Sequence, residues 1–237
     1  MLVTILVIGS CPVQRTLATG GRYHSQYGQD AYLAKLARGG RTYLDIGCND
    51  GIDGSNTYYF YSLGWYGKCI EADPRTYARI RAHSKRTDGL NFAVSNSSRA
   101  SRFTRVLDPN NGLSGLSAHM SVHKRAPWTR FKTETTRVPT IRPFSLLHRY
   151  YRNVTTIDVV SLDVEGGELN ILRSWPFIMK RWCVRVFVIE DNDWCNERTT
   201  LPELSRMLTP MGYRHLESIG MDYVFERSCA PMRRGAE

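Results

Sequence analysis

Acidic side chains and glycines are combined in one short turn of this sequence. Residues 45–51, DIGCNDG, contain two aspartates and two glycines, and Glu71 lies 71 − 47 = 24 residues after Gly47. At about this spacing, an acidic side chain after a second strand accepts hydrogen bonds from the hydroxyls of a ribose. The turn lacks the third glycine of a dinucleotide fingerprint, and its carboxylates disfavour a pyrophosphate but favour a cation. The pattern therefore predicts an adenosyl cofactor that carries a sulfonium and an ammonium group.

The elements that must position these residues alternate between β-rich runs and helical patterns. Strands are expected at residues 42–46, 67–71, 91–94, 156–162 and 184–190, with a terminal hairpin at 213–218 and 221–225 around Gly220. Helices are expected at residues 29–36, 55–63, 75–83 and 202–208, and from 169 to a limit at Pro176. Such an alternation predicts a doubly wound, parallel sheet with helices on both faces. Ligands bind at the carboxyl ends of such strands, which is where the acidic residues fall.

One stretch without a clear periodicity of apolar residues interrupts this alternation. Residues 97–143 are punctuated by glycine, proline, serine and threonine, and we expect an irregular insertion with a hairpin near the substrate. The chain has 237 residues, of which 42% are hydrophobic, so it is long enough for one substantial core. We expect an apolar N-terminal segment at 1–24, one domain at 25–229 that includes the insertion, and a tail at 230–237.

Five segments, in their order and spacing, resemble the FkbM family of S-adenosylmethionine-dependent methyltransferases. They are residues 25–30 (SQYGQD), 43–51 (YLDIGCNDG), 69–74 (CIEADP), 158–166 (DVVSLDVEG) and 188–190 (VIE). The resemblance implies a Rossmann-like class I methyltransferase fold, an α/β fold with a doubly wound, mostly parallel seven-stranded sheet and a C-terminal antiparallel hairpin. It also implies S-adenosylmethionine as the cofactor, and O-methylation of a hydroxyl group on a sugar, a glycan or a small metabolite.

The resemblance also assigns the cofactor to particular residues. Asp45, Gly47, Asn49 and Gly51 are expected to surround its methionine end, and Glu71 is expected to hold its ribose. The remaining residues of the expected cofactor site are Gln26, Cys48, Ala72, Ser95 and Asp163. The two glycines would allow the backbone to approach the ligand closely.

The implied reaction needs an acceptor oxygen in line with the bond between methyl group and sulfur, and a base where the hydroxyl pKa is high. Asp163 is the first candidate for the catalytic role and Glu165 the second, because both follow the strand expected at 156–162. Capping of the next helix is an alternative role for Glu165. His119 and His123 lie in the insertion and could supply a base, although a surface position is more common for such histidines.

Metal ligands are less clearly indicated. Asp163, Glu190 and Asp191 could gather a magnesium ion at the strand ends, so a divalent metal stays open and no residue is assigned to one. The six cysteines include no Cys-x-x-Cys pair and no histidine spacing suited to zinc. Cys48, which stands where the family often has alanine, and Cys69 fall at predicted strand ends. We expect buried, reduced thiols there, without excluding disulfides.

The charge of the chain admits several partners. The formal net charge is +10, with basic residues concentrated at 75–105 and 124–152 and acidic residues at 158–197. Nucleic acid, an acidic glycan and a membrane surface all fit a basic face, although a solvated face is the more usual explanation. No Asn-Pro-Pro-Tyr-like motif follows residues 156–162, which disfavours methylation of a base, whereas methylation of an RNA ribose remains an alternative. A non-catalytic trafficking or membrane-associated protein is another, because some eukaryotic relatives in the family resemble one.

The N-terminal residues leave the localisation open. Residues 2–8 are apolar but too short to span a bilayer, and they could be a truncated signal, a weak anchor or a strand. Cleavage after Ala18 is conceivable, and Asn96 and Asn153 begin tripeptides that could be glycosylated in a secretory compartment. A cytoplasmic location is favoured, with a membrane-associated or secretory location as the alternative. The sequence does not indicate an oligomeric state.

Overall fold

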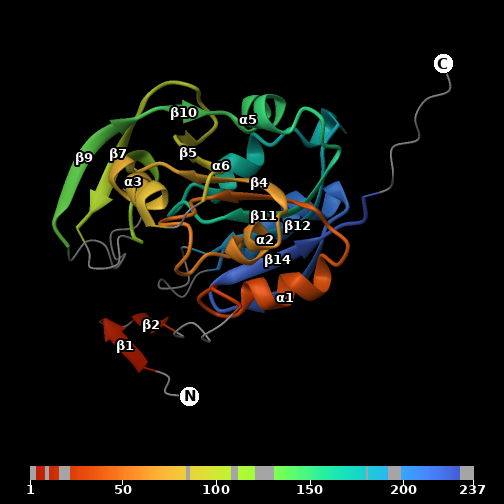
Figure 1. Ribbon diagram of the computed structural model, residues 1–237, viewed down its shortest axis with the longest axis horizontal. Helices are drawn as coiled ribbons and strands as arrows, with labels where there is room; N and C mark the ends of the chain where they lie inside the picture. The colour runs from red at the N-terminus through yellow and green to blue at the C-terminus, as the bar shows by residue number, and fades with distance from the viewer. Residues whose placement is uncertain are drawn as a thin grey trace.

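A seven-stranded sheet forms the centre of the structure, a computed structural model (Figure 1). It describes residues 22–83, 86–107, 112–120, 131–179, 181–191 and 199–229, and the backbone of 4–8 and 11–15. The strand order is β13 (Arg214–Ile219), β14 (Asp222–Glu226), β12 (Cys183–Glu190), β11 (Thr156–Leu162), β3 (Thr42–Ile46), β4 (Tyr66–Glu71) and β5 (Gly89–Asn91). The pairs from β12 to β5 are parallel, and β14 is antiparallel to both of its neighbours. The predicted mostly parallel sheet with a C-terminal antiparallel hairpin is confirmed.

The central strands are apolar along almost their whole length. β11 has the sequence TIDVVSL, and all of its residues except Thr156 are buried. A strand covered on both faces is expected to lack the alternation of apolar and polar residues that a half-exposed strand shows. β11 pairs with β12 on one side and with β3 on the other. The residues that follow these three strands therefore emerge side by side at one edge of the sheet.

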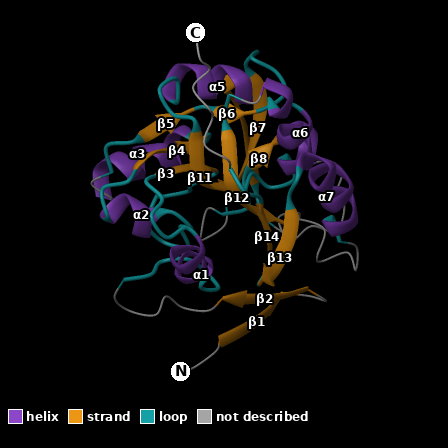
Figure 2. Cartoon of the chain, turned by 90° about the vertical axis from the view of Figure 1, so that its right-hand side faces the viewer, coloured by secondary structure: helices purple, strands orange, loops and turns teal. Residues whose placement is uncertain are grey.

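Helices cover both faces of this sheet (Figure 2). One face carries α1 (Gln29–Leu36), α2 (Tyr58–Ser62) and α3 (Pro74–His83), which contribute Leu33, Phe60 and Ile80 to the core. The other face carries α5 (Pro143–Tyr150), α6 (Glu168–Arg173) and α7 (Leu201–Leu208). Two short 3-10 helices, η2 (Phe177–Met179) and η4 (Thr209–Met211), follow α6 and α7.

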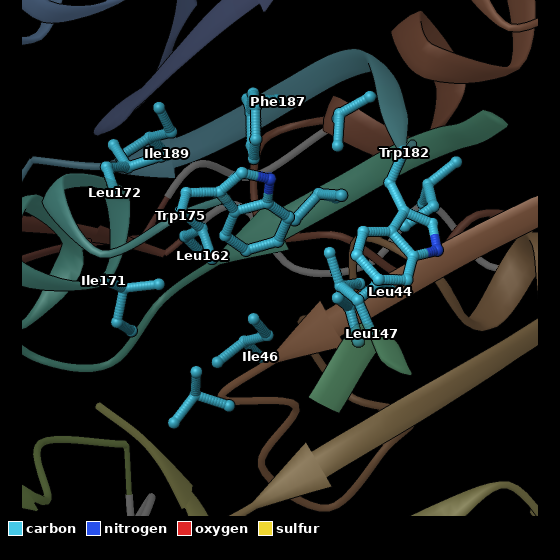
Figure 3. Close-up of a cluster of buried hydrophobic side chains, with 14 of the residues drawn as sticks. Leu44, Ile46, Leu147, Leu162, Ile171, Leu172, Trp175, Trp182, Phe187 and Ile189 are labelled. Atoms are coloured by element: carbon cyan, nitrogen blue, oxygen red, sulfur yellow. The ribbon is translucent and has the colours of Figure 1, made fainter. Parts of the chain in front are cut away.

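The larger apolar cluster lies on the face of α5, α6 and α7 (Figure 3). Trp175 and Phe187 pack edge to face there, with ring centroids 5.3 Å apart. Burying one large apolar side chain stabilises a fold by about 1.5–3 kcal/mol. This cluster therefore holds α6, and with it the turn between β11 and α6, against the sheet.

The insertion is more regular than the sequence predicts. β7 (Ser101–Val106) pairs antiparallel with β8 (Gly115–Leu116) and with β9 (Thr133–Val138), and α4 (Ser117–Met120) follows β8. β9, with the sequence TETTRV, is mostly exposed, so it lacks the apolar positions from which a strand is recognised. The prediction of irregular chain is therefore wrong over this three-stranded sheet, whereas the antiparallel pairing of the consecutive strands β7 and β8 agrees with the predicted hairpin.

The strand expected at 91–94 is also different in the structure. It is divided into β5 and β6 (Ala93–Val94), and β6 leaves the main sheet to pair in parallel with β10 (Thr140–Ile141). The helix expected at 55–63 is shorter, because the hydroxyl of Ser55 accepts hydrogen bonds from the backbone N–H groups of Thr57 and Tyr58. Such side-chain bonds favour a turn or a cap over the interior of a helix.

The expectation of reduced thiols is corrected at four cysteines. Cys48 forms a disulfide with Cys69, and Cys183 forms one with Cys229. The first pair is 21 residues apart in sequence, but parallel pairing of β3 with β4 brings the two residues to a Cα separation of 5.6 Å. The sequence alone contains no signal for this proximity, because it arises from strand pairing.

The N-terminal segment is described only by its backbone. β1 (Thr4–Ile8) and β2 (Cys11–Arg15) pair antiparallel, which agrees with the strand among the three alternatives for residues 2–8. Among the residues that the structure describes, no helix has the length and apolarity needed to cross a membrane. Ala18 and the tail expected at 230–237 lie outside the described residues.

Candidate cofactor and catalytic site

The acidic turn and Glu71 are adjacent at the carboxyl edge of the sheet. The N–H groups of Gly47 and Cys48 donate to the carbonyl oxygen of Ile70 at 2.9 and 3.1 Å, which ties the turn to the end of β4. The carboxylate of Glu71 accepts hydrogen bonds from the backbone N–H groups of Asn49 and, at 2.7 Å, of Asp73. Burial raises the pKa of Glu71 to about 8. The structure thus brings together the two parts of the predicted cofactor site.

Gly47 is needed because the turn approaches the chain itself very closely. Its φ is 91°, and a Cβ atom placed there would lie 1.5 Å from the carbonyl oxygen of Asp163. Gly51, with a φ of 83°, faces Arg86 and the sulfur of Cys69 in the same way. We expected both glycines to make room for a ligand, but the nearest atoms to their missing side chains belong to the protein. They allow the turn to fit between β4 and the end of β11.

Asn49 is the residue of the turn that fits a ligand best. It has a φ of 49°, a left-handed conformation that asparagine tolerates better than most residues. Its Oδ1 atom is buried and has no hydrogen-bond partner among the described residues. Since buried polar atoms are nearly always satisfied, this oxygen is a position for a donor such as an ammonium group.

Asp45 is buried beneath the turn, with 3% of its surface exposed. Its carboxylate accepts hydrogen bonds from the hydroxyl of Thr57 at 2.6 Å and from that of Ser55 at 3.4 Å. Burial raises its pKa, and the nearby charge of Arg86 opposes that shift. Asp45 therefore holds the segment before α2 as well as adding negative charge under the turn.

The other expected cofactor residues contact different parts of the chain. Gln26 is exposed and lies over Gly54, where an added Cβ would be 3.3 Å from its side chain. Cys48 uses its side chain in the disulfide, so only its backbone can face a ligand. Ala72 follows Glu71, and its carbonyl oxygen accepts a hydrogen bond from Asn91. Ser95 is buried after β6, and its N–H donates to the carbonyl oxygen of Ile141.

Three carboxyl groups converge where β11 and β12 end. Oxygen atoms of Asp163, Glu165 and Glu190 lie within 4.8 Å of one another, and all three residues are half-buried. A hydrogen bond joins Asp163 to Glu190. Restricted access to water raises the pKa of Asp163 to about 7, and burial together with the charge of Asp163 raises that of Glu190 well above its ordinary value. The pair can therefore share one proton near neutral pH.

This cluster differs from the metal group that the sequence suggested. Glu165 replaces Asp191, which instead bonds the hydroxyls of Thr200 and Tyr223 at 3.1 and 2.6 Å. The three converging carboxyl groups are oxygen ligands of the kind that magnesium prefers.

Glu168, the first residue of α6, binds the turn that precedes the helix. The carboxylate of Glu168 accepts hydrogen bonds from the backbone N–H groups of Val164 and Gly166 at 2.8 and 3.1 Å. Glu165 has a φ of 60° and directs its side chain into the acidic cluster. The N-cap position of α6 is Gly167 and receives no side-chain cap hydrogen bond, so the capping alternative for Glu165 is wrong.

A buried polar network behind the acidic cluster was not predicted. Asp222 of the terminal hairpin accepts hydrogen bonds from Gln29 at 2.5 Å and from Asn56. Asn56 also donates to the hydroxyl of Ser161 at 3.0 Å. Burial raises the pKa of Asp222 to about 6, and its charge raises that of Asp163. Polar residues at buried strand positions were the available signal for this network.

The insertion lies against the candidate catalytic turn. An added Cβ at Gly115 would be 3.1 Å from the Cβ of Glu165, and one at Gly167 would be 3.2 Å from the ring of His119. The ring of His119 also hydrogen-bonds Asn170 at 3.2 Å, and burial lowers its pKa. His119 thus packs at the start of α6, and His123 lies outside the described residues.

The strand order and this site together define a class I methyltransferase fold, in which β14 lies antiparallel between β12 and β13. The chain belongs to the Methyltransferase FkbM domain family, which it matches over residues 45–215. The fold implies the use of S-adenosylmethionine. The unsatisfied oxygen of Asn49 and the buried carboxylate of Glu71 fit an ammonium group and a ribose.

Two solved structures resemble the chain at low sequence identity. The precorrin-6y C5,15-methyltransferase from Geobacter metallireducens GS-15 is 12% identical, with a TM-score of 0.40 over 89% of this chain and 93% of that one. The hMettl16 catalytic domain in complex with the MAT2A 3'UTR hairpin 6 is 15% identical, with a TM-score of 0.41 over 97% of this chain and 77% of that one. A search of curated proteins found no match.

Proposed function

We propose that this chain is an S-adenosylmethionine-dependent O-methyltransferase that acts on a hydroxyl group of a sugar, a glycan or a small metabolite. The observation that carries the proposal is the hydrogen-bonded carboxyl pair of Asp163 and Glu190, next to the turn that follows β3. S-adenosylmethionine supplies an electrophilic methyl group when it is bound. An attacking hydroxyl must lose its proton, and a carboxylate whose pKa lies near neutrality suits that task.

The cofactor is assigned to the residues around the turn. Glu71 accepts hydrogen bonds from the ribose, and Oδ1 of Asn49 accepts one from the ammonium group. Asp45 provides negative charge below them, which favours a cation in a site with restricted access to water. Gly47 and Gly51 give the turn its shape. Gln26, Cys48, Ala72 and Ser95 are assigned to the surroundings of the cofactor.

Asp163 is assigned as the base. The hydrogen bond between the two groups lowers the pKa of Asp163 and raises that of Glu190, so the shared proton is assigned to Glu190, which donates it to Asp163. This bond favours the ionised form of Asp163, which can then accept the proton of the acceptor hydroxyl. Glu165 lies in the same cluster and is assigned to orienting the acceptor.

The insertion is assigned to the acceptor site. β8 and α4 lie against the turn between β11 and α6, so they cover the acidic cluster from one side. An acceptor held between them and the strand ends would be shielded from bulk water and kept in line with the transferred group. The exposed, polar β9 leaves this part of the chain free to present hydrogen-bonding groups.

A methyl-transfer screen tests the proposal. Purified protein is incubated with labelled S-adenosylmethionine and with sugars, small phenols or RNA, in parallel with Asp163→Asn and Asp191→Asn. Transfer to a hydroxyl compound, lost in Asp163→Asn and retained in Asp191→Asn, supports it. Asp191 is the matched control because it follows β12, the parallel neighbour of β11, but bonds Thr200 and Tyr223. Cofactor binding without transfer to any acceptor contradicts the proposal and favours a non-catalytic protein. Transfer to RNA alone also contradicts it and favours methylation of an RNA ribose.

A further inference from the structure

The disulfide between Cys48 and Cys69 lies within the candidate cofactor site. Cys48 precedes Asn49 in the turn, and Cys69 lies two residues before Glu71 on β4. Residues two apart on a strand point to the same face of the sheet, so the sulfur of Cys69 and the carboxylate of Glu71 share a face. Both cysteines are buried, with exposed fractions of 4% and 0%. The bridge therefore joins the residue beside one proposed cofactor contact to the strand that carries the other.

The turn is packed directly on this bridge. An added Cβ at Gly51 would lie 3.5 Å from the sulfur of Cys69, and Ile80 and Tyr77 of α3 complete the surrounding cluster. The N–H group of Gly51 donates to the carbonyl oxygen of Cys48 at 2.9 Å, which closes the turn around the bridge. In so closely packed a site, a change at the sulfurs must be transmitted to the turn.

Hydrogen bonds hold the turn at its start, at its middle and at its end. Gly47 and Cys48 donate to Ile70 at the start, and Arg86 donates to the carbonyl oxygen of Gly51 at 3.0 Å at the end. Between them, Asn49 is in the left-handed conformation and donates its N–H to Glu71. The disulfide at Cys48 restrains the backbone directly before Asn49, next to its hydrogen bond with Glu71.

Resting on the proposed function, we propose that Cys48 and Cys69 are positioning residues for the cofactor. Their disulfide holds Asn49 over the carboxylate of Glu71, in the arrangement that binds the amino-acid and ribose parts of the ligand together. Opening of the bridge releases the middle of the turn. Binding of the ligand to Asn49 and Glu71 must then also order the turn, and the loss of conformational entropy weakens the binding. The affinity of the protein for S-adenosylmethionine and its product therefore depends on this disulfide.

The second disulfide provides a matched control. Cys183 begins β12, so the bridge to Cys229 lies at the amino edge of the parallel sheet, away from the turn. It joins residues 46 apart in sequence, compared with 21 for Cys48 and Cys69. A longer closed loop restrains the unfolded chain more, so removing the control bridge is expected to lower stability at least as much. Removal of the control bridge should therefore lower stability at least as much as removal of the bridge between Cys48 and Cys69, whereas only removal of the latter should lower the affinity for the cofactor.

Calorimetric titration with S-adenosylhomocysteine separates these effects. The oxidised wild type is compared with the double variants Cys48→Ala/Cys69→Ala and Cys183→Ala/Cys229→Ala, and the thermal unfolding of each is recorded. We expect the first variant to bind about tenfold more weakly or worse, and the control to bind within about twofold of the wild type. The control should nevertheless unfold at a temperature no higher than that of the first variant.

Reversible reduction tests the same molecule without a folding step. In the Cys183→Ala/Cys229→Ala background, a trialkylphosphine breaks the S–S bond between Cys48 and Cys69, giving two thiols and a phosphine oxide whose oxygen comes from water. After removal of the phosphine, glutathione disulfide accepts two electrons, and the bridge forms again with release of two glutathione thiols. The affinity should fall on reduction and return on oxidation, and mass labelling of Cys48 and Cys69 checks which bridge opened.

The outcomes distinguish this inference from the proposed function. Equal affinity of the oxidised wild type and the Cys48→Ala/Cys69→Ala variant, with no change on reduction, overturns the positioning role alone. Equal losses in both double variants overturn it as well, because the effect would then follow stability. Absence of binding by the oxidised wild type overturns the proposed function and this inference together.

Discussion

The carboxyl groups of Asp163 and Glu190 are hydrogen-bonded to each other at the ends of two neighbouring parallel strands. Burial raises the pKa of both, to about 7 for Asp163 and well above the ordinary value for Glu190. In water both groups would be ionised at neutral pH, and two adjacent carboxylates would repel each other. Their arrangement keeps one proton between them, so that one group acts as donor and the other is available as a base.

The first prediction concerns the pH dependence of methyl transfer. If Asp163 is the base, kcat/KM should rise with pH through an apparent pKa of about 7, since only the ionised carboxylate accepts a proton. Glu190→Gln retains a hydrogen-bond donor and should leave the midpoint near its original position. Glu190→Ala removes the donor that favours the ionised form, so the midpoint should move to higher pH. Rate profiles of the three proteins check this, and identical midpoints for the wild type and Glu190→Ala would contradict it.

The second prediction concerns Glu71 and the affinity for the cofactor. Its pKa of about 8 means that the free protein carries a protonated Glu71 at neutral pH, whereas ribose hydroxyls donate to the ionised form. Binding of S-adenosylhomocysteine should therefore strengthen as pH rises from 6 towards 9, with a limiting slope of about tenfold per pH unit below the pKa. Glu71→Gln should bind more weakly and without this dependence.

Calorimetry at several pH values measures both effects. Glu217→Gln serves as the control, because Glu217 is an exposed carboxylate on the terminal hairpin. It should retain both the affinity and the slope of the wild type. A slope that persists in Glu71→Gln would assign the titration to another group and remove the ribose role from Glu71.

The third prediction concerns the stability of the ligand-free protein. The folded-state pKa values of Glu71, Asp163 and Asp222 are about 8, 7 and 6, all above those of exposed carboxyl groups. The folded protein therefore binds more protons than the unfolded chain in this range, so the free energy of unfolding falls as pH rises. This contribution is fully present below about pH 4 and is lost as pH rises through 6 to 8.

Thermal unfolding between pH 5 and 8.5 measures this trend. In Glu71→Gln, the part of the slope above pH 7 should become smaller, because the amide cannot ionise. For one group the slope is limited to about 1.4 kcal/mol per pH unit. The prediction would be contradicted if the unfolding temperature of the wild type increased steadily from pH 5 to 8.5 and that of Glu71→Gln had the same slope above pH 7.

The elements with strong local signals could be predicted from the sequence. α1 and β11 have the predicted bounds, because each combines a clear apolar pattern with a stop or a polar turn. β9 could not be predicted, since its exposed sequence, TETTRV, has no apolar face. Because this signal is missing, we expected irregular chain in the insertion, where the structure has a three-stranded sheet.

The candidate site was predictable to the extent that it follows strand ends. Asp45, Glu71 and Asp163 lie at the carboxyl edge because parallel strands bring their ends together. The contribution of Asp222 depends on Gln29, which is 193 residues away in sequence, and no local pattern indicates such a partner. The disulfide of Cys48 with Cys69 depends in the same way on the pairing of β3 with β4.

The last prediction concerns the close approach at Gly47. An added Cβ would lie 1.5 Å from the carbonyl oxygen of Asp163, so Gly47→Ala forces the turn away from the end of β11. Gly212 is the matched control, because its φ of 86° is close to the 91° of Gly47 but an added Cβ there meets no atom within 4 Å. Both substitutions place alanine in the left-handed region, at a cost of about 1–2 kcal/mol.

The difference between the two variants measures the contact itself. Overpacking of a closely packed site costs about 1–3 kcal/mol more, so Gly47→Ala should be destabilised beyond Gly212→Ala by about that amount in urea unfolding. Since the displaced turn carries Asn49, binding of S-adenosylhomocysteine should also be lost in Gly47→Ala and retained in Gly212→Ala. Equal stabilities would mean that the turn can move without cost, which is incompatible with a cofactor site held by close packing of β3, β4 and β11.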